Sequence, residues 1–343
     1  MKKVILLFVL FLPFNVLAFG SNAKSAILMD MDSGRILYGK DIHYVQSVAS
    51  ISKVMTAICV IENTNINKEI VVGDEILKAY GSGIYVQKGE KIRIKDLLYG
   101  LMMRSGNDAA LVLAKNTSGS TSKFVDLMNK TAKKIKMMDS KFNNPSGLDE
   151  EDDGNISSSY DMALLMSYAM KNKNFRKIVG SKEYTLKTNK NVYKWKNKNK
   201  LLYSYKNTTG GKTGFTKKAK RTLVTSASLN GLNLTVVTIN DGSDFKDHEN
   251  LYKEAFDKYY NYKFLKKGII NIPSENYYRK KLYIKNDVSY PLLEDEGNIL
   301  KIKYELDKKR KYKNKDKVGK VKMYLGDEVV VKEDIYVKVD NDK

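Results

Sequence analysis

Apolar positions recur at helical spacing along some stretches of the chain and alternate with polar positions along others. A nearly unbroken apolar run at residues 51–62 predicts a helix that is buried in the middle of a domain. Residues 222–228 and 232–239 alternate as strands do, and Asn230-Gly231 between them is a strong signal for a two-residue hairpin turn. Helices and strands together predict a domain of the α+β class.

The same patterns predict a further hairpin and further helices. The hairpin is expected at residues 25–30 and 35–38, which flank a turn that begins at Asp32. Asp96 is expected to cap the first of the further helices. These helices are predicted at residues 97–103, 109–115, 124–136, 162–170 and 246–262.

The pattern changes near residue 264 to short alternations of Tyr, Ile, Val and Lys without a convincing helix. This change predicts a small all-β domain at residues 263–343, of the sandwich or hairpin-pair kind, after a larger domain at residues 19–262. The basic run at residues 308–315 fits either a solvated loop or a patch that faces a cell wall or membrane. No terminal membrane helix is expected from the last residues of the sequence.

The first residues have the pattern of a secretory signal. Three residues form a short cationic segment, and an apolar run follows to Val16. Compact side chains up to Ala18 fit a signal peptidase site, so residues 1–18 are predicted to be a cleaved signal peptide. The alternative is an uncleaved membrane anchor, for which the apolar run is shorter than the roughly 20 residues that a span needs.

Basic residues are in large excess. The chain has 343 residues, with 61 Lys and Arg against 39 Asp and Glu. This balance favours attraction to an anionic surface such as acidic lipid or an anionic wall polymer, although a compositional bias of the source genome gives the same excess. Nucleic acid is not an expected partner, because the sequence has no basic stripe with interleaved aromatic residues, no zinc spacing and no recognition helix.

Cysteine and histidine are rare. The single cysteine, Cys59, excludes an intramolecular disulfide and is expected to be a small buried apolar residue. The two histidines, His43 and His248, are expected at the surface or at helix caps. Neither a metal site nor a Ser-His-Asp triad is expected.

Three short motifs that suit nucleophilic catalysis follow one another along the chain. Ser50 and Lys53 lie one turn apart at the start of the buried helix, where an amine can reach a hydroxyl. Ser-x-x-Lys by itself is a weak signal, because it occurs at three other places. The Lys-Thr-Gly that begins at Lys212 occurs once, and Ser105-x-Asn107 lies between it and the first motif.

Four stretches resemble the low-molecular-mass penicillin-binding proteins that are D-alanyl-D-alanine carboxypeptidases. They are ASISKVMT from Ala49, RSGNDAA from Arg104, NPSGLD from Asn144 and KTGFTKKA from Lys212. The resemblance covers roughly residues 25–262. It implies a β-lactamase/transpeptidase-like domain, in which an antiparallel sheet packs against helices beside a helical subdomain, followed by the small all-β domain.

The resemblance implies roles for the first two motifs. Ser50 would be the acylated nucleophile and Lys53 its base, since a lysine amine in a cationic, desolvated cleft has a lowered pKa. Ser105 would relay a proton to the leaving D-alanine. Asn107 would hold the peptide amide of the substrate.

The third motif would bind the rest of the substrate. Lys212 and Thr213 would bind the terminal carboxylate, and Gly214 would let the substrate backbone approach the strand edge. The backbone N–H groups of Ser50 and Phe215 would form the oxyanion hole. The resemblance implies a peptidoglycan stem peptide ending in D-Ala-D-Ala as substrate, β-lactams as covalent inhibitors, no cofactor, and a place outside the cytoplasmic membrane, in vegetative wall or spore cortex.

Two other functions stay open. A β-lactamase needs a glutamate that drives deacylation, and Glu151 and Asn155 have the spacing of such a loop. A wall-binding or β-lactam-sensing protein would be acylated without turnover. Two positions depart from the family pattern. Lys220 replaces the usual glycine. Lys198 stands where relatives often carry arginine; it could contact the substrate carboxylate, but a solvated lysine is the expectation.

Overall fold

A computed structural model describes residues 20–149, 154–272, 278, 281–307 and 311–338. The predicted signal peptide lies outside this part of the chain, as do Glu151 and part of the basic run at residues 308–315. Within the described residues, no helix is both long enough and apolar enough to cross a membrane.

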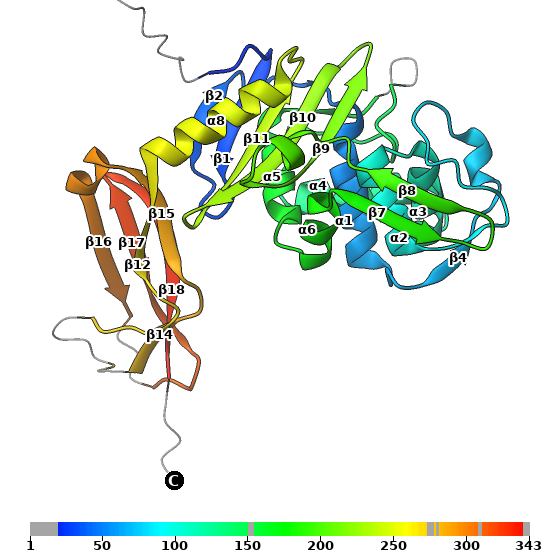
Figure 1. Cartoon of the computed structure of the whole chain (residues 1–343). Helices are drawn as coiled ribbons and strands as arrows, with labels where there is room; N and C mark the ends of the chain where they lie inside the picture. The colour runs from blue at the N-terminus through cyan, green and yellow to red at the C-terminus, as the bar shows by residue number, and fades with distance from the viewer. Residues whose placement is uncertain (1–19, 150–153, 273–277, 279–280, 308–310, 339–343) are drawn as a thin grey trace, which may run out of the picture.

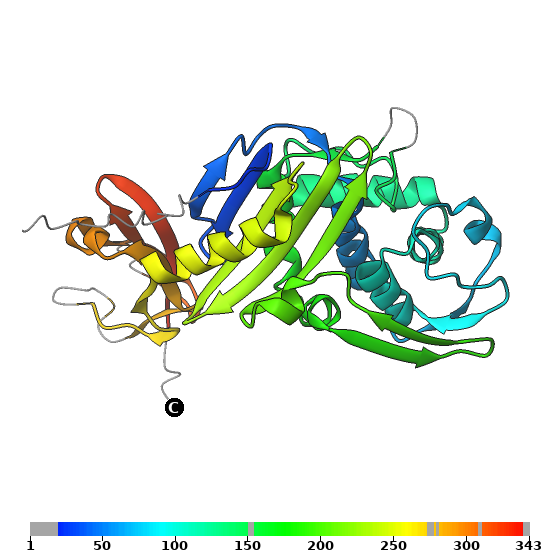
Figure 2. The same ribbon diagram turned by 45° about the horizontal axis from the view of Figure 1, so that its top comes forward.

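The larger domain is built on a five-stranded antiparallel sheet in the order β2-β1-β11-β10-β9 (Figure 2). The predicted turn at Asn230-Gly231 is confirmed, since Leu229 pairs with Leu232 across it. The strands are β1 (Ser25–Asp30), β2 (Ile36–Lys40), β9 (Thr208–Thr216), β10 (Lys220–Leu229) and β11 (Leu232–Ile239).

Helices cover both faces of this sheet, so alternate strand residues enter different cores. Ile27 packs into the larger core with the helical subdomain, while the next residue, Leu28, packs into the core beneath α8. The α-helices are α1 (Lys53–Asn63), α2 (Ile94–Tyr99), α3 (Asn107–Ser118), α4 (Thr121–Lys134), α5 (Ser159–Ala169), α6 (Lys173–Gly180), α7 (Leu201–Ser204) and α8 (Asp244–Lys258). Helix α1 runs through the larger core, as its apolar pattern predicts.

Short hairpins frame the helical subdomain (Figure 1). They pair β4 (Glu69–Val71) with β5 (Lys91–Arg93), and β7 (Glu183–Lys187) with β8 (Val192–Lys196). A further short pair joins β3 (Gln46–Ser47) to β6 (Ile156–Ser157).

The C-terminal domain is all-β, as predicted (Figure 1). It has its own apolar core. Its strands are β12 (Tyr259–Leu265), β13 (Gly268–Ile269), β14 (Leu282–Ile284), β15 (Val288–Leu293), β16 (Leu300–Leu306), β17 (Lys317–Leu325) and β18 (Glu328–Val337). Arg35 of the larger domain contacts this domain by an ion pair with Glu296 and a hydrogen bond of 2.6 Å to the carbonyl of Pro291.

Two helix predictions are wrong in detail. The last helix of the larger domain ends at Lys258 and not at residue 262. The segment that follows is rich in tyrosine, which favours β structure, and it forms strand β12. Asp96 is not a cap. It lies in the first turn of α2, where it accepts a hydrogen bond of 2.8 Å from Nε of Arg93, the residue at the N-cap.

His248 is fully buried, contrary to the expectation of a surface or cap position. Its Nδ1 lies 2.7 Å from the hydroxyl of Thr225, and its Nε2 lies 3.1 Å from the hydroxyl of Thr238. Burial lowers the pKa of His248 to about 3. His43, by contrast, is exposed and lies 2.8 Å from Asp139, as a surface residue would.

Cys59 is buried in α1, which confirms the prediction of a small apolar role. Burial raises the pKa of its thiol to about 12. The thiol therefore stays protonated and unreactive at neutral pH.

Candidate active site

Ser50 lies in a four-residue 3-10 turn that begins at Ala49 and leads directly into α1. Ala49 has a φ of 50°, in the left-handed region that costs a residue with a side chain roughly 1–2 kcal/mol. Neighbouring segments hold this turn: Val48 N–H donates to the carbonyl of Asn155 at 3.2 Å, and the hydroxyl of Thr222 donates to the carbonyl of Val48 at 3.1 Å. The nucleophile candidate is thus fixed at the N-terminal end of α1, where free N–H groups favour negative charge.

Lys53 is completely buried beneath Ser50. Its Nζ lies 3.0 Å from Oγ of Ser50 and 2.7 Å from Oδ1 of Asn107, and it also donates to the carbonyl of Ser146. Burial, together with the positive charge of Lys198, lowers the pKa of Lys53 to about 7. A large fraction of this amine is therefore neutral near pH 7 and able to accept a proton.

Ser105 follows a π-helical turn, Gly100–Arg104, and has a φ of 67°. Its Oγ accepts a hydrogen bond of 3.1 Å from Nζ of Lys212. Asn107 begins α3, and its Nδ2 donates to the carbonyl of Tyr80 at 2.6 Å. This irregular connection, of a kind often found at functional sites, places Ser105 in the lining of the cleft and Asn107 beside Lys53.

Lys212 and Thr213 are successive residues of the edge strand β9 and therefore point to opposite faces. Lys212 is 1% exposed, and its Nζ donates to the carbonyl of Thr213 at 2.6 Å as well as to Ser105. Burial lowers the pKa of Lys212 well below its usual value, and the positive charges of Lys53 and Lys198 act in the same direction. The positive field of these neighbouring amines favours the binding of a carboxylate at this site.

Gly214 lets β9 approach the turn that carries Ser50. A Cβ atom at this position would lie 3.0 Å from the backbone nitrogen of Ser50 and 3.1 Å from that of Ile51, so a larger residue would push the strand away. Phe215 follows with a side chain that is 66% exposed. The strand edge therefore lies close to the Ser50 backbone, as the expected oxyanion hole requires.

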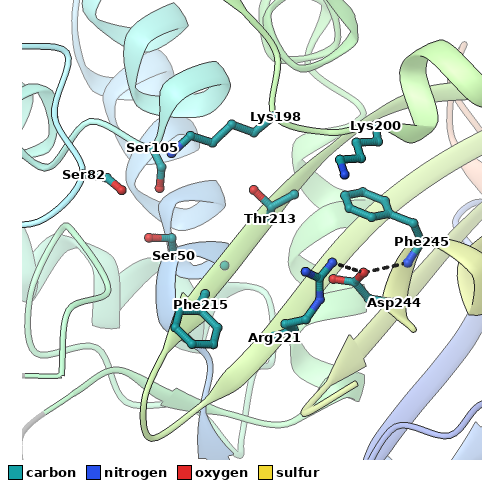
Figure 3. A pocket seen from close by; sticks show the side chains of 11 residues that line it. Ser50, Ser82, Ser105, Lys198, Lys200, Thr213, Phe215, Arg221, Asp244 and Phe245 are labelled. Atoms are coloured by element: carbon teal, nitrogen blue, oxygen red, sulfur yellow. Dashed lines mark hydrogen bonds and ion pairs between the residues drawn. The ribbon is translucent and has the colours of Figure 1, made fainter. Parts of the chain in front are cut away.

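Ser50, Ser105 and Thr213 line one cleft of about 370 Å³ (Figure 3). The buried side chains of Lys53, Asn107 and Lys212 lie behind this lining. Lys198 is exposed, as expected, and its side chain also extends over the cleft toward Ser105. Arg221 closes the far end, where it forms an ion pair of 2.5 Å with Asp244. The lining residues are Ser50, Ser82, Ser105, Lys198, Lys200, Thr213, Gly214, Phe215, Arg221, Asp244 and Phe245.

Two polar partners of the site are backbone carbonyls, which side-chain motifs do not identify. They belong to Ser146, beside Lys53, and to Tyr80, beside Asn107. In the sequence, only the stretch NPSGLD, which resembles the family and includes Ser146, indicates that this segment belongs to the site. Asn155 is completely buried, and its side-chain amide donates to Oγ of Ser52 at 3.0 Å. It therefore supports the 3-10 turn Ala49–Ser52, the nucleophile turn, from beneath and is not part of the cleft lining.

Lys220, at the position of the usual family glycine, has a φ of 59°. The turn between β9 and β10 therefore keeps the left-handed conformation that glycine adopts freely, and lysine tolerates it at a cost. No cluster of His, Cys, Asp or Glu within the described residues is arranged to hold a metal ion.

A family model described as D-alanyl-D-alanine carboxypeptidase matches residues 15–243, which is more than half of the chain. The chain belongs to the D-alanyl-D-alanine carboxypeptidase family. A second model, described as the C-terminal domain of penicillin-binding protein 5, matches residues 259–343. The suspected relationship to low-molecular-mass penicillin-binding proteins is thereby confirmed.

Family members from several bacteria are similar to this chain. The D-alanyl-D-alanine carboxypeptidase DacF of Bacillus subtilis is 36% identical over 211 residues, a match that covers 60% of this chain and 54% of DacF. A D-alanyl-D-alanine carboxypeptidase of Streptomyces sp. strain K15 is 35% identical over 229 residues, which covers 61% of this chain and 77% of that protein. The match thus spans about half the length of DacF.

Solved structures of this family extend the likeness to both domains. Penicillin-binding protein 5 of Haemophilus influenzae aligns with a TM-score of 0.78 at 26% identity, over 94% of this chain and 98% of that one. The D-alanyl-D-alanine carboxypeptidase DacD of Francisella tularensis aligns with a TM-score of 0.70 at 25% identity, over 99% of this chain and 96% of that one. The predicted fold class is therefore confirmed.

Proposed function

We propose that this chain is a serine D,D-carboxypeptidase that removes the terminal D-alanine of peptidoglycan stem peptides through an acyl-enzyme on Ser50. The observation that carries the proposal is the 3.0 Å contact between Nζ of Lys53 and Oγ of Ser50. It is made by a buried amine with a pKa of about 7, which suits a general base. Membership of the carboxypeptidase family supports the same reaction.

In acylation, Lys53 takes the proton of Ser50, and Oγ attacks the carbonyl carbon of the penultimate D-alanine. The N–H groups of Ser50 and Phe215 stabilise the negative charge that develops on the carbonyl oxygen. Asn107 and the carbonyl of Ser146 keep the amine of Lys53 aimed at the nucleophile. The side-chain amide of Asn107 has two N–H groups. One donates to the Tyr80 carbonyl, and we propose that the other donates to the peptide carbonyl of the substrate.

The leaving group departs on the other side of the cleft. Ser105 relays the proton that Lys53 took from Ser50 to the nitrogen of the leaving D-alanine, and Lys212, hydrogen-bonded to Ser105, keeps this hydroxyl in place. The hydroxyl of Thr213 and the amine of Lys198 bind the terminal carboxylate, in a field to which Lys212 adds. Water then hydrolyses the acyl-enzyme and frees Ser50.

Peptidoglycan lies outside the cytoplasmic membrane, so this reaction is extracytoplasmic. We propose that residues 1–18 direct export and that the basic excess of 61 Lys and Arg over 39 Asp and Glu holds the protein near an anionic wall or membrane surface. The β-lactamase alternative has less support. Asn155, one of the two residues with the spacing of a deacylation loop, lies beneath the nucleophile turn and does not line the cleft.

The test is release of free D-alanine from diacetyl-L-Lys-D-Ala-D-Ala by the purified protein. Ser50→Ala should abolish release and also labelling by a fluorescent penicillin, whereas the neighbouring Ser52→Ala should retain the label. Penicillin hydrolysis faster than peptide hydrolysis would instead support a β-lactamase. Stable acylation without release of either product would support a sensor.

A further inference from the structure

The outer face of the larger sheet in the C-terminal domain carries a row of lysines that lie opposite one another. Lys322 of β17 pairs directly with Lys303 of β16 on one side and with Lys332 of β18 on the other. Among the paired strand residues that the structure describes, these are the only two pairs in which one basic residue lies opposite another. The lysine-rich composition of the chain therefore does not by itself explain the row.

The alternation of side chains along the strands turns this row to solvent. Val321 and Met323, the chain neighbours of Lys322, are buried in the apolar cores of the C-terminal domain. Lys322 therefore points to the opposite face of the sheet. The side chain of Lys303 is 66% exposed and that of Lys322, in the middle of the row, is 23% exposed. Lys332 is exposed as well, so all three amines can reach a partner on this face.

The carboxylates of this face are too few to neutralise its lysines. Glu305 lies 2.7 Å from Nζ of Lys322 and 3.8 Å from Nζ of Lys303, and Asp334 lies 2.7 Å from Nζ of Lys317. The lysines at the outward positions of β16, β17 and β18 are Lys301, Lys303, Lys317, Lys320, Lys322 and Lys332, and the carboxylates there are Glu305 and Asp334. The face therefore keeps a positive field.

Neither stability nor protection of a sheet edge accounts for the row. Like charges directly opposite each other on neighbouring strands destabilise a sheet. Edge strands often carry lysine because its charge discourages pairing with other chains. Strand β16 is an edge of the sheet, but β17 lies between β16 and β18, so this reason does not apply to Lys322. A local rule that is broken without compensation within the fold is expected where function requires it.

The form of the row selects a linear anionic partner. Neighbouring strands lie about 4.8 Å apart, so the three lysines follow one another across the strands over about 10 Å. The ammonium group of lysine binds phosphate as a point charge. A single phosphate contacts only part of the row, whereas a chain with a phosphate in each repeat contacts all of it and gains from the linkage of its charges.

The face has few apolar groups that could enter a bilayer. Proteins that lie in a membrane interface bury apolar side chains there. Among the described residues of the C-terminal domain, the large apolar side chains that are exposed are those of Tyr260, Ile269, Ile299 and Ile302. None of them stands at an outward position of β16, β17 or β18, since Ile302 pairs with Met323 on the inner face. The face thus offers charge without apolar anchors, which suits a hydrated polymer.

We propose that the lysine row (Lys303, Lys322 and Lys332) binds a linear phosphodiester polymer of the cell wall, laid across strands β16, β17 and β18. The inference rests on the proposed function for the place of the protein outside the cytoplasmic membrane, but binding does not require acylation of Ser50. These strands lie on the far side of the molecule from the helical subdomain (Figure 1). The bound polymer therefore leaves the cleft open to substrate.

Fluorescence anisotropy of labelled poly(glycerol phosphate) tests the proposal. The lysine-row variant, which combines Lys303→Gln, Lys322→Gln and Lys332→Gln, should bind the polymer about thirtyfold more weakly than the wild type, roughly threefold for each screened ion pair. The slope of the logarithm of the binding constant against that of the salt concentration should also become shallower, by roughly 0.7 for each phosphate contact that is lost. Absence of polymer binding by the wild type would overturn the proposal.

A matched control removes the same charge elsewhere. It combines Lys91→Gln, Lys187→Gln and Lys263→Gln, at exposed strand positions that each lie opposite an uncharged residue. This control should change the affinity for the polymer by no more than about twofold, because exposed charges far from the contact are screened. Equal weakening in the lysine-row variant and in the control would mean that binding follows net charge alone, and the row would lose its assignment.

Two comparisons identify the partner. Free glycerol phosphate should displace the labelled polymer only at a phosphate concentration about a hundredfold higher than the unlabelled polymer needs. At equal phosphate concentration, the wild type should bind the polymer more tightly than vesicles of phosphatidylcholine with phosphatidylglycerol. Equal displacement by the monomer would exclude a linear partner, and tighter binding to the vesicles would assign the row to lipid; either result contradicts the proposal.

Activity measurements separate this inference from the proposed function. The lysine-row variant should release D-alanine as fast as the wild type, and Ser50→Ala should bind the polymer as tightly as the wild type. Absence of D-alanine release by the wild type contradicts the proposed function, whereas unchanged polymer binding by the lysine-row variant contradicts the row.

Discussion

Lys53 and Lys212 are buried in one cleft, and the charge of Lys53 adds to burial in lowering the pKa of Lys212. Each amine has a hydroxyl partner, Ser50 at 3.0 Å and Ser105 at 3.1 Å. Under the proposed function, Lys53 accepts the proton of Ser50 while Lys212 holds Ser105 in place, and the neighbours of these two amines set the pH at which the site works.

Lys198→Gln should move the acidic limb of acylation to higher pH. The charge of Lys198 helps to lower the pKa of Lys53, so its removal raises that pKa and Lys53 becomes neutral only at higher pH. In the wild type, the rate of labelling by a fluorescent penicillin should rise with pH through about 7. The half-point should rise by roughly half a pH unit in the variant. An unchanged or lower half-point would contradict this account.

Gly147→Ala should damage the nucleophile turn. Gly147 has a φ of 76°, and a Cβ atom there would overlap the carbonyl oxygen of Ala49 and the hydroxyl of Ser52. We expect a loss of about 3 kcal/mol in the free energy of unfolding and a slower reaction with penicillin. Gly119→Ala is the matched control, because its φ is 81° but nothing lies within 4 Å of the added carbon. It should cost about 1 kcal/mol and leave acylation unaffected.

Lys220→Gly should stabilise the protein. Lysine at this position has a φ of 59°, which glycine adopts without strain, although the greater freedom of glycine in the unfolded chain offsets part of the gain. Urea denaturation should show an increase of about 0.5 kcal/mol in the free energy of unfolding. Lys217→Gly, at an exposed position of the same turn without a positive φ, should not be stabilising. Equal effects of the two changes would rule out backbone strain as the cause.

His248→Gln should reduce the sensitivity of stability to acid. The pKa of His248 falls from 6.5 to about 3 on burial, so below pH 6.5 the unfolded chain binds a proton that the folded protein excludes. Stability is therefore lost as the pH falls, by about 1.4 kcal/mol per pH unit for this one group. Between pH 6.5 and pH 5 the variant should lose about 2 kcal/mol less than the wild type in urea denaturation. Parallel losses would show that the folded protein accommodates the charged ring.

Much of the site was predictable because it consists of side chains in short motifs, and the order of these motifs along the chain resembles that of a known family. Ser50 and Lys53 are separated by one helical turn, so local geometry alone brings them together. The contact of Lys212 with Ser105 instead spans 107 residues of sequence separation, and only resemblance to a family indicated it. The carbonyl of Ser146 was unpredictable in principle, because every residue carries one.

Elsewhere, tertiary context decided what local sequence left open. His248 looked like a surface residue of a charged helix, yet its face of α8 packs on the sheet, where Thr225 and Thr238 supply hydrogen-bond partners. The end of α8 at Lys258 depends on the pairing of Tyr259 with Leu293 in the second domain. The sequence of α8 by itself identifies neither the threonines that bond His248 nor the strand that pairs with Tyr259.

The burial of Cys59 has a practical consequence. Since it is the single cysteine of the chain and its thiol has a pKa of about 12, maleimide and other thiol-directed reagents meet almost no reactive background. A cysteine introduced beside the cleft, or a pair placed one in each domain, would carry a fluorophore or spin label at a chosen position. The native protein thus provides a ready scaffold on which distances can be followed during a single catalytic cycle.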